Sequence, residues 1–144
     1  MPAASRKKTV RILGAAALAV VLLAVVLLNN SRPRPVYWSG TAESFTNDDP
    51  APAELVLDIK RYAPFFGKTY YTGSVTVNGR RYEDIHEYEY PLNPFVPAEV
   101  KADFGGRQLE VYQDCVILEE QDGLLRVSVR SNGPFLVYEI DPRG

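Results

Sequence analysis

Asp84 and His86 are the residues whose types and spacing come closest to a catalytic pair. Residues two positions apart in a β-strand face the same side, so the carboxylate of Asp84 would orient the imidazole of His86 as a general base. The arrangement lacks a nucleophile, because Ser74 is expected on the opposite face and no motif surrounds Cys115. A structural histidine is therefore the preferred interpretation, and a small envelope hydrolase or transferase using His86 and Asp84 is an alternative.

A tyrosine-rich stretch around this pair predicts a binding surface. The surface would comprise Tyr71, Asp84, His86 and Tyr88, which the expected strand register places on one face. Tyrosine offers a large contact area at low entropic cost, and its ring stacks on sugars, so a cell-wall glycan is one ligand that it would suit. The alternative is that these tyrosines form the rim of the core, because tyrosine is common in sheets.

Metal and cofactor sites lack a motif in this sequence. With one cysteine and one histidine, the chain cannot build the usual cysteine or paired-histidine zinc sites. The acidic segment Asn47–Asp49 lacks the alternating ligands and the glycine of a calcium-binding loop. We therefore expect no catalytic residues, no metal, no cofactor and a protein that is not an enzyme.

The residues from Val36 onward are rich in Val, Tyr, Thr and Phe, and turn signals recur among them, which is typical of short strands. The segment Pro91–Pro97 contains three prolines and is predicted to be a connection. A change of phase within Gln108–Gln121 predicts either a bulge near Gln113–Cys115 or a strand that changes sheets. The predicted strands are Tyr37–Phe45, Glu54–Arg61, Thr69–Val77, Arg80–Tyr90, Val100–Phe104, Gln108–Gln121, Leu124–Ser131 and Phe135–Ile140.

Two turns predict hairpins whose registers can be checked. A two-residue turn at Asn78-Gly79 places Val75 opposite Tyr82, and one at Asp122-Gly123 places Leu118 opposite Val127. Both hairpins then sort into one apolar and one mostly polar face, whereas a one-residue slip would scramble the faces. The predicted fold class is all-β: an antiparallel β-sandwich or partly open barrel of about seven to eight short strands, preceded by one N-terminal transmembrane helix.

The N-terminal segment predicts a membrane anchor. Residues 9–28 include the uncharged run Ile12–Leu28 and are long enough to span a bilayer core as a helix. A cleaved signal peptide is the alternative, but the run is longer than a signal core and no small-x-small site follows it. The expected organisation is a basic cytoplasmic N-terminus (residues 1–8), a signal anchor (9–28), a proline- and arginine-containing stalk (29–35) and an extracytoplasmic β-domain (36–144).

The charge distribution predicts the orientation of the anchor and its partners. Four basic residues precede the apolar run and two follow it, which places the N-terminus in the cytoplasm and the β-domain outside the cell membrane. From Asn29 onward there are 12 basic and 18 acidic residues, a balance of −6, so no nucleic-acid partner is expected. The expected partners are the lipid bilayer, through residues 9–28, and a neighbouring membrane or cell-wall component.

Together these features predict a single-pass, membrane-anchored binding or accessory module without catalytic activity. Two alternatives to this binding module are the hydrolase or transferase described above and a structural subunit of a larger membrane complex. For that role the small residues around Gly14 would let the helix pack closely against another helix.

Overall fold

The computed structural model describes residues 3–44, 52–64, 67–85, 94–102 and 113–143. The chain divides into two compact units, one formed by Met1–Arg32 with Ala63–Lys68 and the other by Pro33–Tyr62 with Thr69–Gly144. His86 and Tyr88, two of the four residues of the predicted binding surface, lie outside the described residues.

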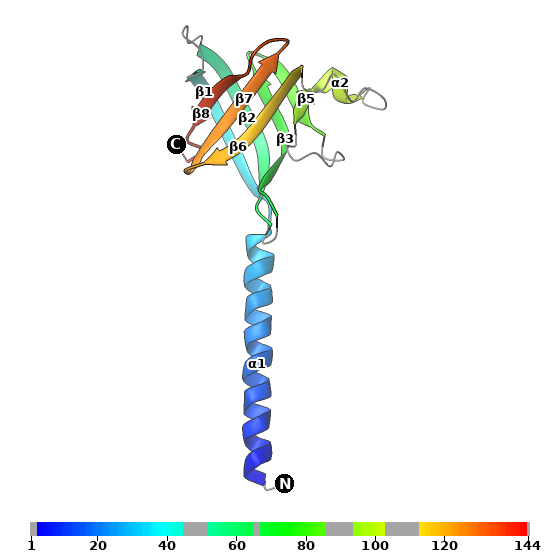
Figure 1. Cartoon of the computed structure of the whole chain (residues 1–144), viewed down its shortest axis with the longest axis vertical. Helices are drawn as coiled ribbons and strands as arrows, with labels where there is room; N and C mark the ends of the chain where they lie inside the picture. Colours follow the sequence, from blue (N-terminus) through cyan, green and yellow to red (C-terminus); the bar gives the residue numbers. More distant parts are fainter. Residues whose placement is uncertain (1–2, 45–51, 65–66, 86–93, 103–112, 144) are drawn as a thin grey trace. The chain divides into compact units, whose positions relative to one another are not determined.

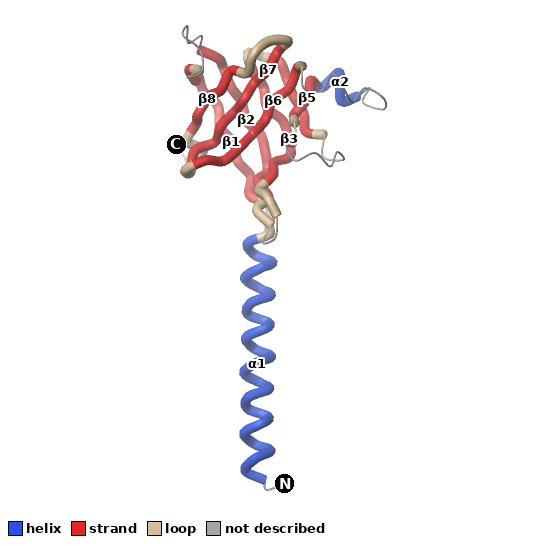
Figure 2. The backbone as a smooth tube through the Cα atoms, in the orientation of Figure 1, coloured by secondary structure: helices blue, strands red, loops and turns tan. Residues whose placement is uncertain are grey.

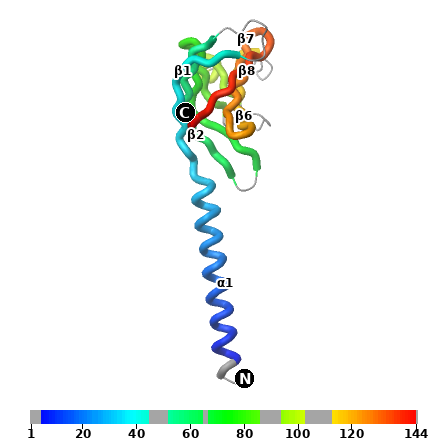
Figure 3. Tube along the Cα trace, turned by 90° about the vertical axis from the view of Figure 1, so that its left-hand side faces the viewer, coloured from blue at the N-terminus to red at the C-terminus, as the bar shows by residue number. Residues whose placement is uncertain are grey.

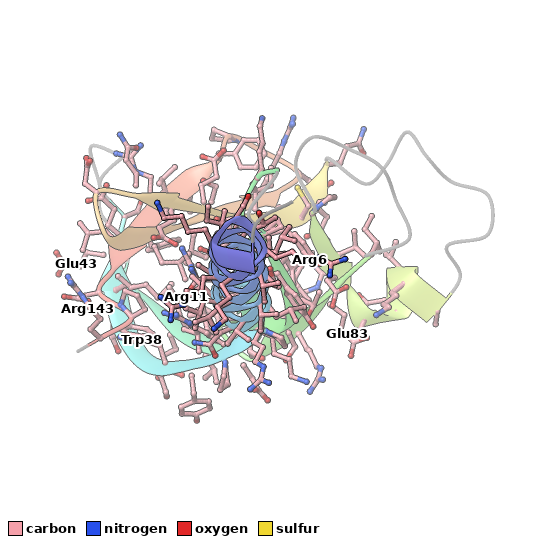
Figure 4. The ribbon with its side chains drawn as sticks, turned by 90° about the horizontal axis from the view of Figure 1, so that it is seen from below. Arg6, Arg11, Trp38, Glu43, Glu83 and Arg143 are labelled. Atoms are coloured by element: carbon pink, nitrogen blue, oxygen red, sulfur yellow. The ribbon has the colours of Figure 1, made fainter. Side chains whose placement is uncertain are left out.

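The first unit contains helix α1 (Ala3–Asn30), a single 28-residue helix (Figure 1). Its segment Ser5–Asn30 is long and apolar enough to cross a membrane, since 26 residues rise about 39 Å and a bilayer core is about 30 Å thick. The side chains of Arg6 and Arg11 project from the helix (Figure 4). The helix ends where the backbone amide and hydroxyl of Ser31 both donate to the carbonyl of Leu27, at 3.0 and 2.7 Å.

The helix is longer than the apolar run that predicts it, and the stalk is correspondingly shorter. Regular structure resumes at Arg34, so only Ser31–Pro33 separate the helix from the first strand, against the seven residues expected for the stalk. Asn29 and Asn30 continue the helix because the capping bonds to Leu27 close its last turn.

The second unit is one antiparallel sheet whose strands follow chain order from first to last (Figures 1 and 2). β1 and β8 lie side by side (Figure 3), and an antiparallel bridge joins Ser44 to Tyr138. The sheet is therefore a nearly closed barrel, which confirms the predicted fold class. Its strands are β1 (Arg34–Glu43), β2 (Pro52–Tyr62), β3 (Tyr70–Val77), β4 (Arg80–Asp84), β5 (Phe95–Pro97), β6 (Asp114–Gln121), β7 (Leu124–Ser131) and β8 (Leu136–Ile140).

Apolar side chains fill the inside of the barrel. Alternate residues of every long strand point inward, as the period of two along a strand requires. Each fully buried aliphatic or aromatic side chain of this size contributes about 1.5–3 kcal/mol through removal from water. The largest fully buried members of this core are Phe95, Leu55, Leu57, Ile59, Val75, Val116 and Val127.

Both predicted hairpins have the expected register. Val75 pairs with Tyr82 across the first turn, and Leu118 pairs with Val127 across the second. The turn residues all have positive φ, as a two-residue type I′ turn requires: Asn78 and Gly79 at 48° and 82°, Asp122 and Gly123 at 54° and 79°.

Two predictions about the middle of the chain were wrong. The predicted strand Val100–Phe104 is in its described part a short helix, α2 (Ala98–Ala102), and Phe95–Pro97 within the predicted connection forms β5. Proline is tolerated in β5 because the strand is only three residues long and Pro97 is its last residue.

The bulge expected near Gln113–Cys115 does not interrupt β6, whose pairing with β7 is continuous from Asp114 to Gln121. The alternation of apolar and polar residues fails there because four consecutive residues of β6, from Cys115 to Leu118, are buried. The strand therefore buries both of its faces.

Candidate functional site

The described residues of the predicted binding surface, Tyr71 and Asp84, have different surroundings. Asp84 is half-buried and its Oδ2 accepts a hydrogen bond from the backbone N–H of Gly73 at 2.7 Å. Gly73 has a φ of +117°, and a Cβ there would overlap the carbonyl oxygen of Asp58. Asp84 therefore satisfies a backbone amide at a position that requires glycine, which is a structural role.

Tyr71, in contrast, lines a pocket of about 410 Å³ at one end of the barrel. At this end β1 begins, β2 ends, β3 begins and β6 ends. We call it the Arg34 end, defined by Arg34, Arg61, Tyr71, Glu120 and the ion pair of Arg143 with Asp141. The complete lining is Arg34, Pro35, Val36, Arg61, Tyr71, Glu120, Gly123, Leu125, Pro142 and Arg143.

The charged side chains enter this pocket because they continue the inward-facing series of their strands. In β2, Arg61 follows Ile59, Leu57 and Leu55 at intervals of two residues. In β6, Glu120 follows Leu118 and Val116 in the same way, and in β1 Arg34 occupies the inward position before Val36. The apolar core thus ends in a layer of charged and polar groups.

Arg61, Glu120 and Tyr71 form a hydrogen-bonded triad across three strands. The Nε of Arg61 donates to Oε2 of Glu120 at 2.7 Å, and the hydroxyl of Tyr71 donates to the same oxygen at 3.3 Å. The hydrogen bond from Arg61 lowers the pKa of Glu120. Burial, followed by the nearby Glu120 carboxylate, raises the pKa of Tyr71 to about 12. At neutral pH the triad therefore holds one positive charge, one negative charge and a neutral phenol.

Two more arginines border the triad. Arg34 is exposed and lies directly opposite Arg61 in the pairing of β1 with β2. Among the described residues, the side chain of Arg34 has neither a hydrogen-bond partner nor an ion-pair partner. Arg143, at the edge of the barrel in Figure 4, is paired with Asp141, its Nε lying 3.0 Å from Oδ1. With three arginines against Glu120 and Asp141, the Arg34 end carries a net charge of +1.

The opposite end of the barrel contains a second triad with the same composition. Arg80 lies 2.8 Å from Oδ2 of Asp114, and the hydroxyl of Tyr82 donates to Oδ1 of that carboxylate at 3.0 Å. A second carboxylate, Glu99 of α2, accepts a hydrogen bond from Arg80 at 3.0 Å. Burial, and then the bond to Asp114, raises the pKa of Tyr82 to about 12. We call this set the Arg80 end; its net charge is −1.

Cys115 and several aromatic residues outside the two triads have structural surroundings. Cys115 is fully buried and pairs with Arg130 in the sheet, and burial raises the pKa of its thiol to about 11. Trp38 is half-buried, packs against the barrel core and lies over Gly40. Tyr62 and Tyr70 stack on each other with ring centroids 4.8 Å apart. In the described part of the chain, no group of three or more His, Cys, Asp or Glu side chains is arranged to hold a metal.

Sequence reasoning missed the Arg34 end, although a signal for it exists. Arg61 and Glu120 occupy inward-facing positions in strands whose other inward-facing residues are mostly aliphatic. A charged residue at such a position indicates that the strand has reached the end of the barrel. Only the pairing of β1 with β2 brings Arg34 to the same place. Comparison with protein-family models, curated proteins and solved structures found no match to this chain.

Proposed function

We propose that this chain is a membrane-anchored binding module without catalytic activity, whose β-barrel lies outside the cell membrane and binds its ligand at the Arg34 end. The observation that carries the proposal is the pocket of about 410 Å³, lined by a positive charge excess and by apolar side chains. Ligand sites commonly have volumes of about 300–1,000 Å³ and lie at the mouths of barrels.

The anchor is supported by the length and composition of α1. Large apolar side chains along the helix, such as Leu13, Val20 and Leu23, are about three-fifths exposed. Exposure of this apolar surface to water would be unfavourable, whereas the hydrocarbon core of a lipid bilayer would remove it from water. The orientation is supported by the four basic residues before the apolar run.

A labelling experiment in intact cells tests the location of the barrel. The single native cysteine, Cys115, is fully buried and has a raised thiol pKa, so it provides a silent background. Cysteine is introduced at an exposed site on the barrel (Ser39→Cys) or on the helix (Ser5→Cys). With a membrane-impermeant maleimide, Ser39→Cys should react in intact cells or spheroplasts, and Ser5→Cys only after lysis. The reverse pattern, or recovery of the chain in the soluble fraction, would contradict the proposal.

A photo-crosslinking experiment tests binding at the Arg34 end. A photoreactive amino acid replaces Pro142, which lines the pocket, or Lys101, which is exposed on α2 at the Arg80 end. Illumination of cells should give an adduct of defined mass from position 142 and none from the matched position 101. Equal adducts from both positions, or none from either, would mean that the pocket is not the binding site.

A further inference from the structure

We propose that the Arg34 end binds an anionic group, a phosphate or a carboxylate, that is carried on a short apolar stem. This inference rests on the proposed binding function and adds the chemistry of the ligand. It follows from the way in which the three arginines of the pocket are paired and from the side chains between them.

The three arginines differ in how their charges are compensated. Arg61 is bound by Glu120, and Arg143 is bound through Nε and, at 3.4 Å, through NH2 by Asp141. Arg34 has no such partner among the described residues. The positive charge excess of the pocket therefore resides on Arg34.

The register of β1 and β2 places the charge of Arg34 directly opposite a second guanidinium group. Arg34 is the cross-strand partner of Arg61, and the pairs that follow on the same face are Val36 with Ile59 and Trp38 with Leu57. Like charges directly opposite each other on one face of a sheet are destabilising. An anion between the two guanidinium groups would relieve this repulsion and accept hydrogen bonds from the planar donors of Arg34.

The pocket also offers apolar surface to the rest of the ligand. Leu125 is buried at its floor, Val36 is half-buried, and Pro35 and Pro142 complete the apolar lining. A fully hydrated inorganic anion would leave this surface unused. An anion attached to a few carbon atoms would cover it and gain about 0.8 kcal/mol for each buried methylene group, which favours an amphiphile over a bare ion.

The negative net charge of the domain confines anion binding to places where arginine is locally in excess. The residues from Asn29 onward carry a balance of −6, so the domain as a whole repels anions. An anion is attracted only where arginine exceeds carboxylate, as it does at the Arg34 end. Because Arg34 follows the last helical residue, Asn30, by four positions, the anion has two sources: the headgroup of an anionic lipid or a soluble organic phosphate or carboxylate.

Calorimetric titration of the full chain in nanodiscs of zwitterionic lipid tests the inference. The probes are butyl phosphate, inorganic phosphate and butanol, and empty nanodiscs provide the blank. Butyl phosphate should bind more tightly than inorganic phosphate, butanol should not bind, and the affinity should fall as salt is added. The variant Arg34→Ala should lose at least tenfold in affinity, and Arg34→Lys should retain part of it.

The matched control is Arg81→Ala, which removes another exposed arginine of the barrel that is paired with Glu83 and does not line the pocket. Arg81→Ala should bind butyl phosphate as the wild type does. Equal losses in Arg34→Ala and Arg81→Ala, or equal binding of butanol and butyl phosphate, would overturn the anion site. If no probe binds while the photoreactive group at position 142 still forms its adduct, the ligand class is wrong and the binding function stands.

A second set of nanodiscs identifies the source of the anion. When anionic phosphatidylglycerol replaces part of the zwitterionic lipid, a headgroup that already occupies the site should weaken the binding of butyl phosphate to the wild type and leave Arg34→Ala unchanged. Undiminished binding to the wild type would assign the site to a soluble anion. Both of these outcomes support an anion site. If phosphatidylglycerol weakened the binding of butyl phosphate to Arg34→Ala as much as to the wild type, the anion site would be contradicted, because Arg34 would play no part.

Discussion

Both ends of the barrel contain an arginine, a tyrosine and a carboxylate in contact, and they differ in the further charged residues beside these three. Each end has a triad of arginine, tyrosine and carboxylate, and β6 supplies the carboxylate of both, Asp114 at its first inward position and Glu120 at its last. At the Arg80 end the addition is a second carboxylate, Glu99. At the Arg34 end the additions are Arg34 itself and the ion pair of Arg143 with Asp141, which is internally neutral.

This difference separates a structural element from a binding element. A triad occurs at both ends, with the phenol pKa raised to about 12 in each, and it ties β6 to strands that are not its neighbours in the sheet, where the apolar core stops. Among the described residues the side chain of Arg34 has no partner, and it lies opposite the like charge of Arg61, so it adds no comparable stabilising contact. The comparison therefore supports the proposal that the triads stabilise the barrel and that Arg34 binds the ligand.

The largest expected effect is at the Arg80 end. The side chain of Asp114 is only 18% exposed, forms an ion pair with Arg80 and accepts a hydrogen bond from Tyr82. Replacing it by asparagine (Asp114→Asn) removes a largely buried charge from this pair and should lower the free energy of unfolding by about 2 kcal/mol. Urea unfolding of the full chain in nanodiscs, followed by the fluorescence of the single tryptophan, Trp38, measures the change.

The control for this variant is Asp141→Asn, which breaks the pair with Arg143 at an exposed site near the chain's end. Exposed ion pairs contribute little, so its stability should equal that of the wild type within error. If Asp114→Asn were no less stable than Asp141→Asn, the triad at the Arg80 end would not have the structural role assigned to it.

A smaller effect, which depends on pH, is expected for the carboxylate of the other triad. The side chain of Glu120 is 38% exposed, so solvent screens its pair with Arg61, and Glu120→Gln should cost about 0.5 kcal/mol at pH 7. Because Arg61 lowers the pKa of Glu120 below the ordinary value of 4.5, this stability is present above pH 4.5 and is lost as the pH falls through the folded-state pKa.

The measurement is the difference in unfolding free energy between wild type and Glu120→Gln as a function of pH. The difference should be constant above about pH 5.5 and vanish in acid. A difference that instead grew toward acidic pH would show that the pKa of Glu120 is raised and that Arg61 does not stabilise its carboxylate.

The smallest expected change in stability comes from converting the Arg34 end into an analogue of the Arg80 end. Arg34→Glu places a second carboxylate opposite Arg61, as Glu99 stands beside Arg80. The repulsion is replaced by attraction, so the barrel should become more stable by about 0.3 kcal/mol while the binding of butyl phosphate is lost. A clear loss of stability in this variant would show that Arg34 has a structural role, contrary to the comparison.

The helix and the hairpins could be predicted from the sequence because local interactions determine them. An uncharged run of this length favours a spanning helix, and the turns at Asn78-Gly79 and Asp122-Gly123 fix both registers through positive φ values. The error at Val100–Phe104 has a different origin, because the described residues of this short segment form α2, whose Glu99 binds Arg80 nineteen positions earlier in the chain. Such a tertiary contact is not visible in local propensity.

The candidate site was predictable only in part. The sequence grouped Tyr71 with Asp84, whereas in the structure Tyr71 lines the pocket and Asp84 accepts a hydrogen bond from the backbone of Gly73. The Arg34 end depends on the pairing of β1 with β2 and on a contact between Arg61 and Glu120, which are 59 residues apart. No turn links these strands closely enough for their register to be read from sequence spacing.

The most direct test of the account is an NMR titration of the wild-type chain in zwitterionic nanodiscs, in which the Nε–H resonances of the arginines are followed as butyl phosphate is added. The account predicts that the resonance of Arg34 shifts most, that Arg61 shifts with it, and that Arg80 at the other end of the barrel is unchanged. A shift of Arg80 as large as that of Arg34, or shifts confined to the methyl groups of Val36 and Leu125, would contradict the claim that the two ends differ in function through Arg34.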